Sequence, residues 1–450
     1  MTVTVEITVN GSADPVGRYL TWTPYAASAR LVAAEGLTGP VTVVLRNADG
    51  NVGRLAFRSD PTEDGEPETK LPLPVDGSPV GFLLSGEFME ASVDDGDAVL
   101  EAVVDDEVVA QVPFMVRVRK DAETLTDAER DRFVSAFAVL NNRGLGLFRG
   151  FHAMHTEDTN DEAHGLDAFL PWHRAYLLDL ERELQVIDPA VALPYWRFDR
   201  PAPRLFSADF VGAPSGPPSA FGGPPPVLSA ANPLRSWTIN GAPWVDRHPR
   251  FADPRTSAAS PQPGRLVLDE RTLLAFAAQE GLPYAFEDVP GIPDEEQQIG
   301  FRDILEGNPH GAAHVSFAGY IRAPGTAAGD PLFFLLHCNV DRIWAQWQWN
   351  EERFDGADVA TYFYRGAAGD PVQTRIGHNL LDTMWPWNGD TGGVRPVTAP
   401  RQPLLGSRVV AGPPTTPTVG DLIDFQGHAD GRPPCGFDYD DVPFEKRPPS

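Results

Sequence analysis

Histidines gather in two groups along this chain, at spacings that suit metal ligands. The sequence of 450 residues has ten histidines, and seven of them fall within residues 152–173 or residues 310–337. The seven are His152, His155, His164, His173, His310, His314 and His337. A lone histidine on an apolar face is usually a core residue, but two groups that each cross several elements predict metal binding.

His310 and His314 are four residues apart in a segment that we expect to be helical. That spacing places both imidazoles on one face, where two nitrogens can reach one ion. A zinc hydrolase with this spacing carries a glutamate directly after the first histidine as its general base. Here that residue is Gly311, so the hydrolytic interpretation lacks its base.

The ligand type restricts the metal. Ligation by imidazole alone, without cysteine or carboxylate, suits copper, zinc, iron or nickel. Three histidines per ion leave coordination positions open, as a reactive site requires. Two such triads within one domain favour a dinuclear site over two independent ones.

Two helices are expected to hold histidines in a buried interior. Asp330 and Pro331 suit the N-cap and first turn of a helix that carries His337 and is apolar almost all round. Pro171 similarly marks the start of a helix on which His173 shares its face with leucines. A buried imidazole stays neutral because burial disfavours its charged form, and neutral imidazole is the form that binds metal.

The chain divides by texture into two predicted domains. Residues 1–118 hold short alternating segments such as Val3–Val9, separated by turn signals, and predict an all-β, sandwich-like accessory domain. Residues 119–450 contain the clustered histidines and predict a mainly α catalytic domain with much irregular loop. Its first helix should begin after Thr126, which opens a capping box with Glu129.

Composition limits the partners. The formal net charge is −27, which argues against nucleic acids and anionic membrane surfaces as partners. The first residues show no basic segment followed by an apolar run, and no stretch is long and apolar enough to cross a membrane. We therefore expect a protein without membrane association, either cytoplasmic or exported without a signal peptide of its own.

Two long motifs resemble those of one known family. Ala163–Arg174 (AHGLDAFLPWHR) closely resembles the first copper motif of tyrosinases and catechol oxidases, and Asp330–Trp344 (DPLFFLLHCNVDRIW) resembles the second. Shorter matches are Leu193–Trp196 (LPYW), Glu306–Pro309 (EGNP) and a C-terminal tyrosine motif at Gly436–Pro443 (GFDYDDVP). The resemblance covers nearly all of the predicted catalytic domain and leaves the N-terminal domain outside.

The resemblance implies a type 3 copper centre: two copper ions, each held by three histidines, with O2 as co-substrate. It also implies a central bundle of four helices that presents the histidines inward, because facing helices direct side chains to one point. The six implied ligands are His155, His164, His173, His310, His314 and His337.

The first of these ligands has an alternative in His152. In the family an aromatic residue precedes this ligand by seven positions and a phenylalanine precedes it by four. Phe148 and Phe151 fit that pattern if the ligand is His155. We therefore expect His155 to bind copper and His152 to lie beside the site.

Four positions depart from the family's pattern. Glu162 stands where some members carry a cysteine, and Leu336 stands where a histidine is usual. The other two departures bear on the substrate. Many tyrosinases carry Asn after the ligand that corresponds to His310, and that Asn and a glutamate together position a water that takes the phenol proton. The glutamate is present as Glu306, but Gly311 replaces the Asn, so we expect weak hydroxylation of monophenols. Val315 follows His314 where some bacterial tyrosinases carry Arg, so a substrate carboxylate loses a partner at that position.

The expected reaction is copper-dependent oxidation of ortho-diphenols or ortho-aminophenols to quinone-type products with O2, with hydroxylation of monophenols left open. The expected partner is a small phenolic substrate. The sequence leaves open the oligomeric state and whether a helper protein delivers copper. One alternative is oxygen binding without turnover, as in haemocyanins, with residues 1–118 limiting access. A zinc hydrolase is the other alternative, weakened by Gly311.

Overall fold

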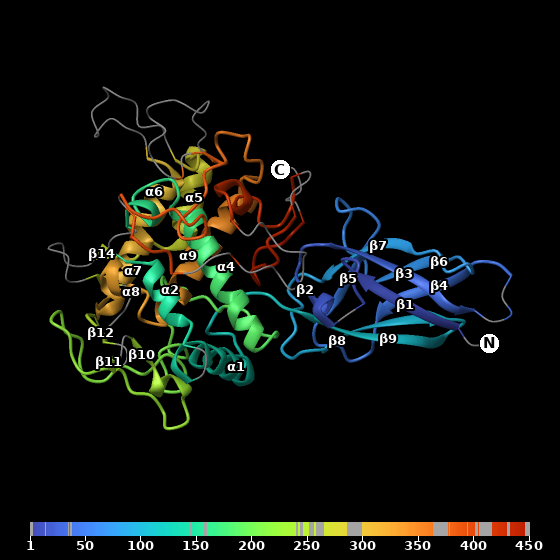
Figure 1. Cartoon of the computed structure of the whole chain (residues 1–450), viewed down its shortest axis with the longest axis horizontal. Coiled ribbons are helices and arrows are strands. Elements are labelled where there is room, and N and C mark those ends of the chain that lie inside the picture. The colour runs from blue at the N-terminus through green and yellow to red at the C-terminus, as the bar shows by residue number, and fades with distance from the viewer. Residues whose placement is uncertain are drawn as a thin grey trace. The chain divides into compact units, whose positions relative to one another are not determined.

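The structure is a computed structural model that describes residues 3–13, 15–34, 36, 38–143, 146–156, 160–239, 242–243, 246–251, 256–257, 265–285, 299–362, 377, 379–393, 395–400, 404, 416–429 and 433–445. Contacts between residues divide the chain into two compact units, both drawn in Figure 1. Unit 1 contains Met1–Arg119 and Phe425–Ser450, and unit 2 contains Lys120–Leu405 and Pro414–Asp424. The sequence predicts one domain over residues 119–450, whereas the contacts group the C-terminal segment with the N-terminal strands.

Unit 1 is built from two sheets, seen as the blue strands of Figure 1. One sheet has the strand order β1-β3-β7-β5, and the other has the order β2-β9-β8-β4-β6. Neighbouring strands are antiparallel except β2 and β9, which are parallel. The bounds are Val3–Val9 (β1), Tyr19–Leu20 (β2), Tyr25–Ala34 (β3), Val41–Asn47 (β4), Leu55–Arg58 (β5), Glu68–Leu73 (β6), Val80–Gly86 (β7), Ala98–Val104 (β8) and Glu107–Val116 (β9). The β-structure predicted for the N-terminal part is therefore present.

Alternating burial explains why these segments form sheets. In β1 the side chains of Val5, Ile7 and Val9 are buried, while that of Thr4 is exposed. A strand turns successive side chains to opposite faces, so every second residue of β1 contributes to the core. The turn after β1 uses Gly11, whose φ of +75° favours glycine.

The C-terminal segment is fastened to unit 1 through buried hydrogen bonds. Trp22 Nε1 donates to the carbonyl of Tyr439 at 2.8 Å, and the backbone N–H of Thr23 donates to Asp438 Oδ2 at 2.9 Å. Arg119 Nη1 donates to the hydroxyl oxygen of Tyr439 at 2.9 Å. The tyrosine motif thus completes the interior of unit 1, which is why the contacts differ from the predicted boundary.

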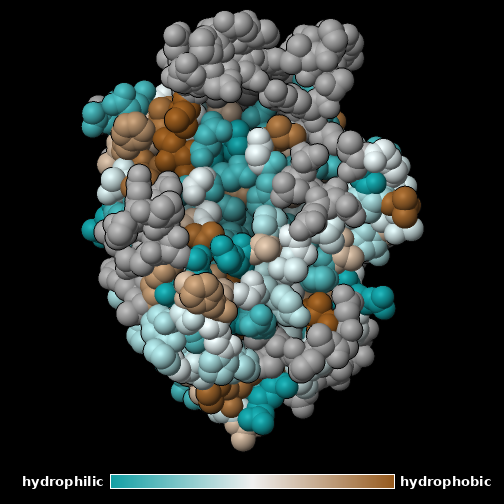
Figure 2. Space-filling view, turned by 90° about the vertical axis from the view of Figure 1, so that its left-hand side faces the viewer, coloured by the Kyte–Doolittle hydropathy of each residue, from teal (hydrophilic) through white to brown (hydrophobic). Residues whose placement is uncertain are grey.

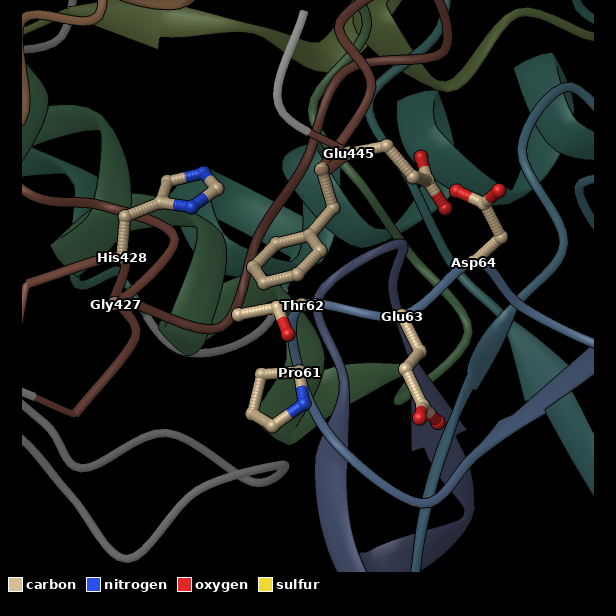
Figure 3. Close-up of a pocket in the computed structure, with 8 residues that line it drawn as sticks. Pro61, Thr62, Glu63, Asp64, Gly427, His428 and Glu445 are labelled. Carbon is tan, nitrogen blue, oxygen red and sulfur yellow. The ribbon is translucent and has the colours of Figure 1, made fainter. Parts of the chain in front are cut away.

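Unit 1 also contains a pocket of about 190 Å³ between the loop at residues 61–64 and the C-terminal segment (Figure 3). The ring of His428 stacks on Phe444 with 4.6 Å between the centroids. Glu445 forms an ion pair with the buried guanidinium of Arg58. None of the clustered histidines lines this pocket, so it is not part of the predicted metal site.

Unit 2 is mainly helical, and Figure 1 shows α2, α4, α7 and α9 grouped within it. The helices are Asp127–Ala138 (α1), Phe148–Met154 (α2), Asn160–Ala163 (α3), Phe169–Ile187 (α4), Glu270–Glu280 (α5), Phe301–Leu305 (α6), Gly311–His314 (α7), Pro324–Ala327 (α8) and Leu332–Asn350 (α9). Short strands are Thr238–Ile239 (β10), Ala242–Pro243 (β11), Arg247–Pro249 (β12), Thr256–Ser257 (β13), Arg265–Leu266 (β14) and Phe317–Gly319 (β15). Single π or 3-10 turns lie at Val139–Arg143, Pro233–Ser236, Glu306–His310, Tyr320–Arg322 and Val419–Leu422.

The predicted capping box at the start of α1 is confirmed. The hydroxyl of Thr126 accepts from the N–H of Glu129 at 3.2 Å, and the carboxylate of Glu129 accepts from the N–H of Thr126 at 2.8 Å. Two N–H groups that the helix cannot satisfy are paired in this way. Within the described part of the chain, no helix has both the length and the apolar character needed to span a membrane.

The helices α4 and α9 form the interior of unit 2 and are buried along most of their length. Arg174 Nε of α4 donates to Asp341 Oδ1 of α9 at 2.6 Å, and both side chains are buried. The first residue of α9, Leu332, donates its N–H to the carboxylate of Asp330, which also pairs with buried Arg247 at 2.5 Å. These contacts fix the two helices that carry predicted metal ligands.

Candidate metal centre

The structure brings the six predicted histidines into two triads. In each triad one ring nitrogen per residue lies within 4.8 Å of the other two. His155 directly follows α2, His164 follows α3 and His173 lies in α4. The second triad consists of His310, His314 and His337, from the turn before α7, the end of α7 and α9.

In the first triad each Nδ1 atom faces an oxygen. His155 Nδ1 lies 2.9 Å from the carbonyl of Pro324, and His173 Nδ1 lies 2.7 Å from the carbonyl of Phe169. His164 Nδ1 lies 3.3 Å from Glu306 Oε1. Oxygen acceptors at Nδ1 keep the proton there, so that each Nε2 presents a lone pair.

The second triad follows the same rule at two of its three members. His310 Nδ1 lies 2.8 Å from the carbonyl of Glu306, and His314 Nδ1 lies 2.6 Å from the carbonyl of Ile321. His337 differs, because its Nε2 lies 3.2 Å from His314 Nε2 and its buried Nδ1 has no hydrogen-bond partner among the described residues. The orientation of His337 is therefore set by packing in α9.

The two triads face one another across a single interior space. The rings of His173 and His337 are stacked, with 4.1 Å between their centroids. The rings of His164 and His310 are also stacked, with 5.8 Å between their centroids. Each contact joins one member of each triad, so two bound ions would share one site.

The nitrogen geometry fits a metal ion. His155 Nε2 and His164 Nε2 lie 2.9 Å apart, although both rings hold their proton at Nδ1. Two lone pairs that face each other at this distance repel unless a cation lies against them. Among the described residues, the buried Nε2 atoms of His173 and His310 have no hydrogen-bond partner either. One ion at each triad, with imidazole ligands, would satisfy all four atoms.

Burial keeps these imidazoles in the neutral form that binds metal. It holds the pKa of His155, His173, His310 and His337 well below the usual value, and the neighbouring imidazoles lower it further. Burial lowers the pKa of His314 to about 4. At neutral pH no proton competes with a metal ion for these nitrogens.

Two phenylalanines line the site, and each lies four residues before a histidine on the same helix. The Phe169 ring lies 4.9 Å from that of His173 and 5.0 Å from that of His310. The Phe333 ring lies 4.3 Å from that of His337 and 4.7 Å from that of His155. Both are fully buried. The walls are therefore apolar and exclude water from around the triads.

Glu306 lies against the first triad and is held by residues that sequence reasoning did not single out. Its Oε1 accepts from the N–H of Gly165 at 2.7 Å, and its Oε2 accepts from Arg302 Nη1 at 2.7 Å. Burial raises the pKa of Glu306, but the His164 hydrogen bond and Arg302 outweigh it, so the pKa lies below the usual value. Only the i, i+4 spacing of Arg302 and Glu306 could have indicated this pair.

His152 lies apart from both triads. Its half-buried ring packs near Gly329, where a Cβ atom would come within 3.5 Å of His152 Nε2. Burial lowers its pKa. The structure therefore brings His155, rather than His152, together with His164 and His173.

The two predicted substrate-pocket positions follow the histidines of α7. Gly311 is half-buried, and a Cβ atom there would lie 3.4 Å from the carbonyl oxygen of Glu306, an ordinary contact. Val315 is half-buried, and its carbonyl accepts from Arg250 Nη1 at 2.9 Å. Both positions adjoin the second triad.

This chain is similar in sequence to known proteins. A family model described as the common central domain of tyrosinase matches residues 145–350. The tyrosinase of Streptomyces glaucescens is 34% identical over 289 residues, which are 60% of this chain and 92% of that protein. Grixazone synthase of Streptomyces griseus is 32% identical over 273 residues, which are 52% of this chain and 85% of that protein.

Among solved structures, a functional unit of octopus haemocyanin is 18% identical with a TM-score of 0.44, covering 73% of this chain and 69% of that one. The sequence matches to the tyrosinases decide the relationship, because they span nearly the whole of those proteins. With two histidine triads positioned to bind metal, this chain belongs to the tyrosinase family, whose members are oxidoreductases that use two copper ions and O2.

Proposed function

We propose that this chain oxidises ortho-diphenols or ortho-aminophenols to quinone-type products with O2, using one copper ion at each triad. The observation that carries the proposal is the face-to-face arrangement of the triads, with His173 and His337 stacked at 4.1 Å. Triads that face each other in this way would hold two ions as one centre rather than as two independent ones. When bound, copper supplies the redox chemistry, and the protein supplies orientation and a dry pocket.

The six histidines would hold the ions through Nε2, and oxygens at Nδ1 fix five of the six rings in place, His337 being the exception. Outer hydrogen bonds of this kind set the tautomer and raise the basicity of the ligand nitrogen. The carbonyls of Pro324 and Phe169 serve the first triad, and those of Glu306 and Ile321 serve the second. The ligand roles of His155 and its five partners are part of the proposal.

Glu306 acts through His164 in this proposal. Its carboxylate accepts from His164 Nδ1 and is held as an anion by Arg302. An ionised acceptor makes His164 a stronger ligand than a neutral carbonyl would. A second role for Glu306, as a partner of the water that takes a phenol proton, stays a prediction and requires a neighbour that Gly311 does not provide.

Diphenols are the favoured substrates because Gly311 has no side chain to hold that water. A monophenol must lose its hydroxyl proton before it is hydroxylated, and a positioned acceptor speeds that loss. A diphenol or aminophenol needs only oxidation at a ring that already has two ortho groups. We therefore infer weak activity on monophenols and strong activity on catechols.

One experiment tests the proposal: copper content by mass spectrometry and steady-state oxygen uptake, both on the same copper-loaded sample. The substrates are a monophenol, a catechol and an ortho-aminophenol, with His173→Ala as the matched inactive variant. The proposal predicts uptake with the catechol or the aminophenol and none with His173→Ala. A copper-loaded chain that consumes no oxygen with any of them contradicts it.

The same sample distinguishes the proposed oxidase from a haemocyanin-like oxygen carrier. Oxygen that binds reversibly, with no product formed from a catechol, would identify a carrier instead of an oxidase. Adding copper salt to the metal-free chain also tests whether copper loading requires a helper protein. Full activity without any helper would show that none is required.

A further inference from the structure

Arg250, which the sequence motifs do not single out, lies beside the second triad. It directly follows β12, which pairs with β15, and its backbone N–H donates to the carbonyl of Ser316 at 3.1 Å. Its Nη1 donates to the carbonyl of Val315 at 2.9 Å. The guanidinium of Arg250 therefore lies next to Val315, the residue that follows His314 and whose own side chain is apolar.

Arg322 approaches the centre from another segment. The carbonyl of Ile321 accepts from His314 of the second triad at 2.6 Å, and the carbonyl of Pro324 accepts from His155 of the first triad at 2.9 Å. Arg322 lies between these two carbonyls in sequence and is exposed. Its exposed side chain thus belongs to a short segment whose carbonyls contact both triads.

Both arginines flank the segment that follows His314. Arg250 contacts Val315 and Ser316, and Arg322 directly follows Ile321, whose carbonyl holds His314. Burial and then the positive charge of Arg322 lower the pKa of Arg250. Among the residues that the structure describes, no carboxylate forms an ion pair with either arginine, and the buried Nε of Arg250 has no hydrogen-bond partner. Like charges placed together without an anion repel each other, and an anionic ligand would relieve that repulsion.

The surroundings are open to a polar ligand. Figure 1 labels β12, α7 and α8 on the left-hand side of unit 2, and Figure 2 shows that side. Hydrophilic side chains gather around a hollow on this face, and the hydrophobic ones form small separate groups among the coloured residues (Figure 2). A charged substituent can remain hydrated there while its aromatic ring enters the apolar interior.

We propose that Arg250 and Arg322 form a carboxylate subsite at the mouth of the dinuclear centre, so that the preferred substrates are catechols whose side chain carries a carboxylate and no ammonium group. The proposal rests on the proposed function, because it names the substrate class of the same site. A guanidinium binds a carboxylate through paired N–H donors, and it repels a cationic side chain. The positive charge that position 315 lacks is thereby supplied by Arg250 and Arg322.

A series of catechols with matched rings and different charges tests the subsite. The substrates are 3-(3,4-dihydroxyphenyl)propionate, 4-methylcatechol and dopamine, which carry negative, zero and positive charge. We expect kcat/KM to fall in that order, with the difference carried by KM. Raising the KCl concentration should reduce the differences in kcat/KM among the three substrates, because salt screens partly exposed charges.

The variants Arg322→Gln and Arg250→Gln locate the effect. Each should lower kcat/KM for the carboxylate roughly fivefold, the upper range for a partly exposed ion pair. Each variant should leave kcat/KM for 4-methylcatechol unchanged and raise kcat/KM for dopamine. Arg322→Lys, which keeps the positive charge, should retain part of the kcat/KM for the carboxylate that Arg322→Gln loses. Exposed Arg271 of α5 supplies the control, because Arg271→Gln removes the same charge from a helix that contributes nothing to the proposed subsite.

A binding measurement separates failure of the subsite from failure of the oxidase. Calorimetry with 3-phenylpropionate and 3-phenylpropanol, which are not oxidised, should show tighter binding of the carboxylate to wild type than to Arg322→Gln. Equal kcat/KM for the carboxylate and 4-methylcatechol in wild type would overturn the subsite and leave the oxidase intact. Arginine-dependent binding without any oxygen uptake would overturn the oxidase and leave the subsite. Because Arg322 is exposed, its variant remains informative even if Arg250→Gln fails to fold.

Discussion

The imidazole rings of His173 and His337 lie parallel, with 4.1 Å between their centroids and 5° between their planes. They belong to different triads and to different helices, α4 and α9. Each has a phenylalanine four residues earlier, Phe169 and Phe333, that packs against its ring. The two helices thus present the same local arrangement to one space, and the pair joins two triads into one site.

This arrangement predicts the copper content of single variants. His337→Ala removes one ligand of the second triad, and three imidazoles are the fewest that hold copper well in an open site. Bound copper should fall from about two ions per chain to about one, measured by mass spectrometry after dialysis. His155→Ala should give the same loss from the first triad.

The control for copper content is His152→Ala. The ring of His152 lies outside both triads, so this variant should keep as much copper as wild type. Loss of an ion in His152→Ala, with full retention in His155→Ala, would exchange the roles of the two residues.

The buried pair of Arg174 and Asp341 predicts a large effect on stability. The side chains are 0% and 2% exposed, and they join α4 to α9 at 2.6 Å. Asp341→Ala leaves the buried guanidinium without that carboxylate, which should cost about 3–5 kcal/mol of unfolding free energy. Denaturant unfolding of the metal-free chain measures the cost.

A double variant checks that this cost comes from the charge left behind. Arg174→Met together with Asp341→Leu removes both charges and should recover much of the loss. If the double variant is as unstable as Asp341→Ala, lost packing around the pair explains the effect better than the loss of the carboxylate does.

Glu306→Gln tests whether the carboxylate strengthens His164 as a ligand. The amide has nearly the same shape but no charge, so it is a weaker acceptor for His164 Nδ1 and loses the ion pair with Arg302. Copper affinity at the first triad should fall about 10- to 100-fold, as for other groups that orient a ligand. Competition with a chelator measures it, and an unchanged affinity would restrict Glu306 to another role.

Local features of this chain could be predicted from sequence because their causes are local. The capping box at Thr126 needs only a residue three positions later, and the strand Val3–Val9 needs only its alternation. The pairing of His310 with His314 follows from a spacing of four on one helical face. The motif around His337 marks a buried helix by composition alone.

The features that sequence did not predict depend on residues far apart in the chain. His164 meets Glu306 across 142 positions, and Arg250 meets Val315 across 65. Nothing in either segment specifies its partner, because tertiary packing brings the segments together. The grouping of Tyr439 with unit 1 has the same origin, since it depends on the hydrogen bond from Trp22.

Asp438 predicts a pH dependence in unit 1. Burial, only partly offset by hydrogen bonds from Thr21, Gln426 and Thr23, raises its pKa from 3.8 to about 6. The folded state therefore binds this proton more tightly than the unfolded state. The resulting stability is complete below pH 3.8 and is lost as the pH rises through about 6, a total of roughly 3 kcal/mol.

Comparison with Asp438→Asn isolates that effect from other titrating groups. Between pH 4 and 7 the difference in unfolding free energy should move by roughly 3 kcal/mol in favour of Asp438→Asn. Exposed Asp49 offers the control, since Asp49→Asn should show no such change. A difference that does not vary with pH would mean that Asp438 stays charged in the folded chain.

Gly311→Asn tests the account of substrate preference. Gly311 has helical φ and ψ of −59° and −34°, and a Cβ atom there meets only the carbonyl of Glu306 at 3.4 Å, so the backbone and the space around Cβ accept a side chain. The added amide can hold a water beside Glu306, and that water can take the proton of a monophenol. Turnover of a monophenol relative to a catechol should rise several-fold, because a positioned proton acceptor can contribute about 100-fold to a rate.

Gly311→Ala is the control, because it adds bulk without an amide and should leave the ratio of monophenol to catechol turnover unchanged. If alanine raises the ratio as much as asparagine does, the effect comes from the shape or rigidity of α7, and the water has no part in it.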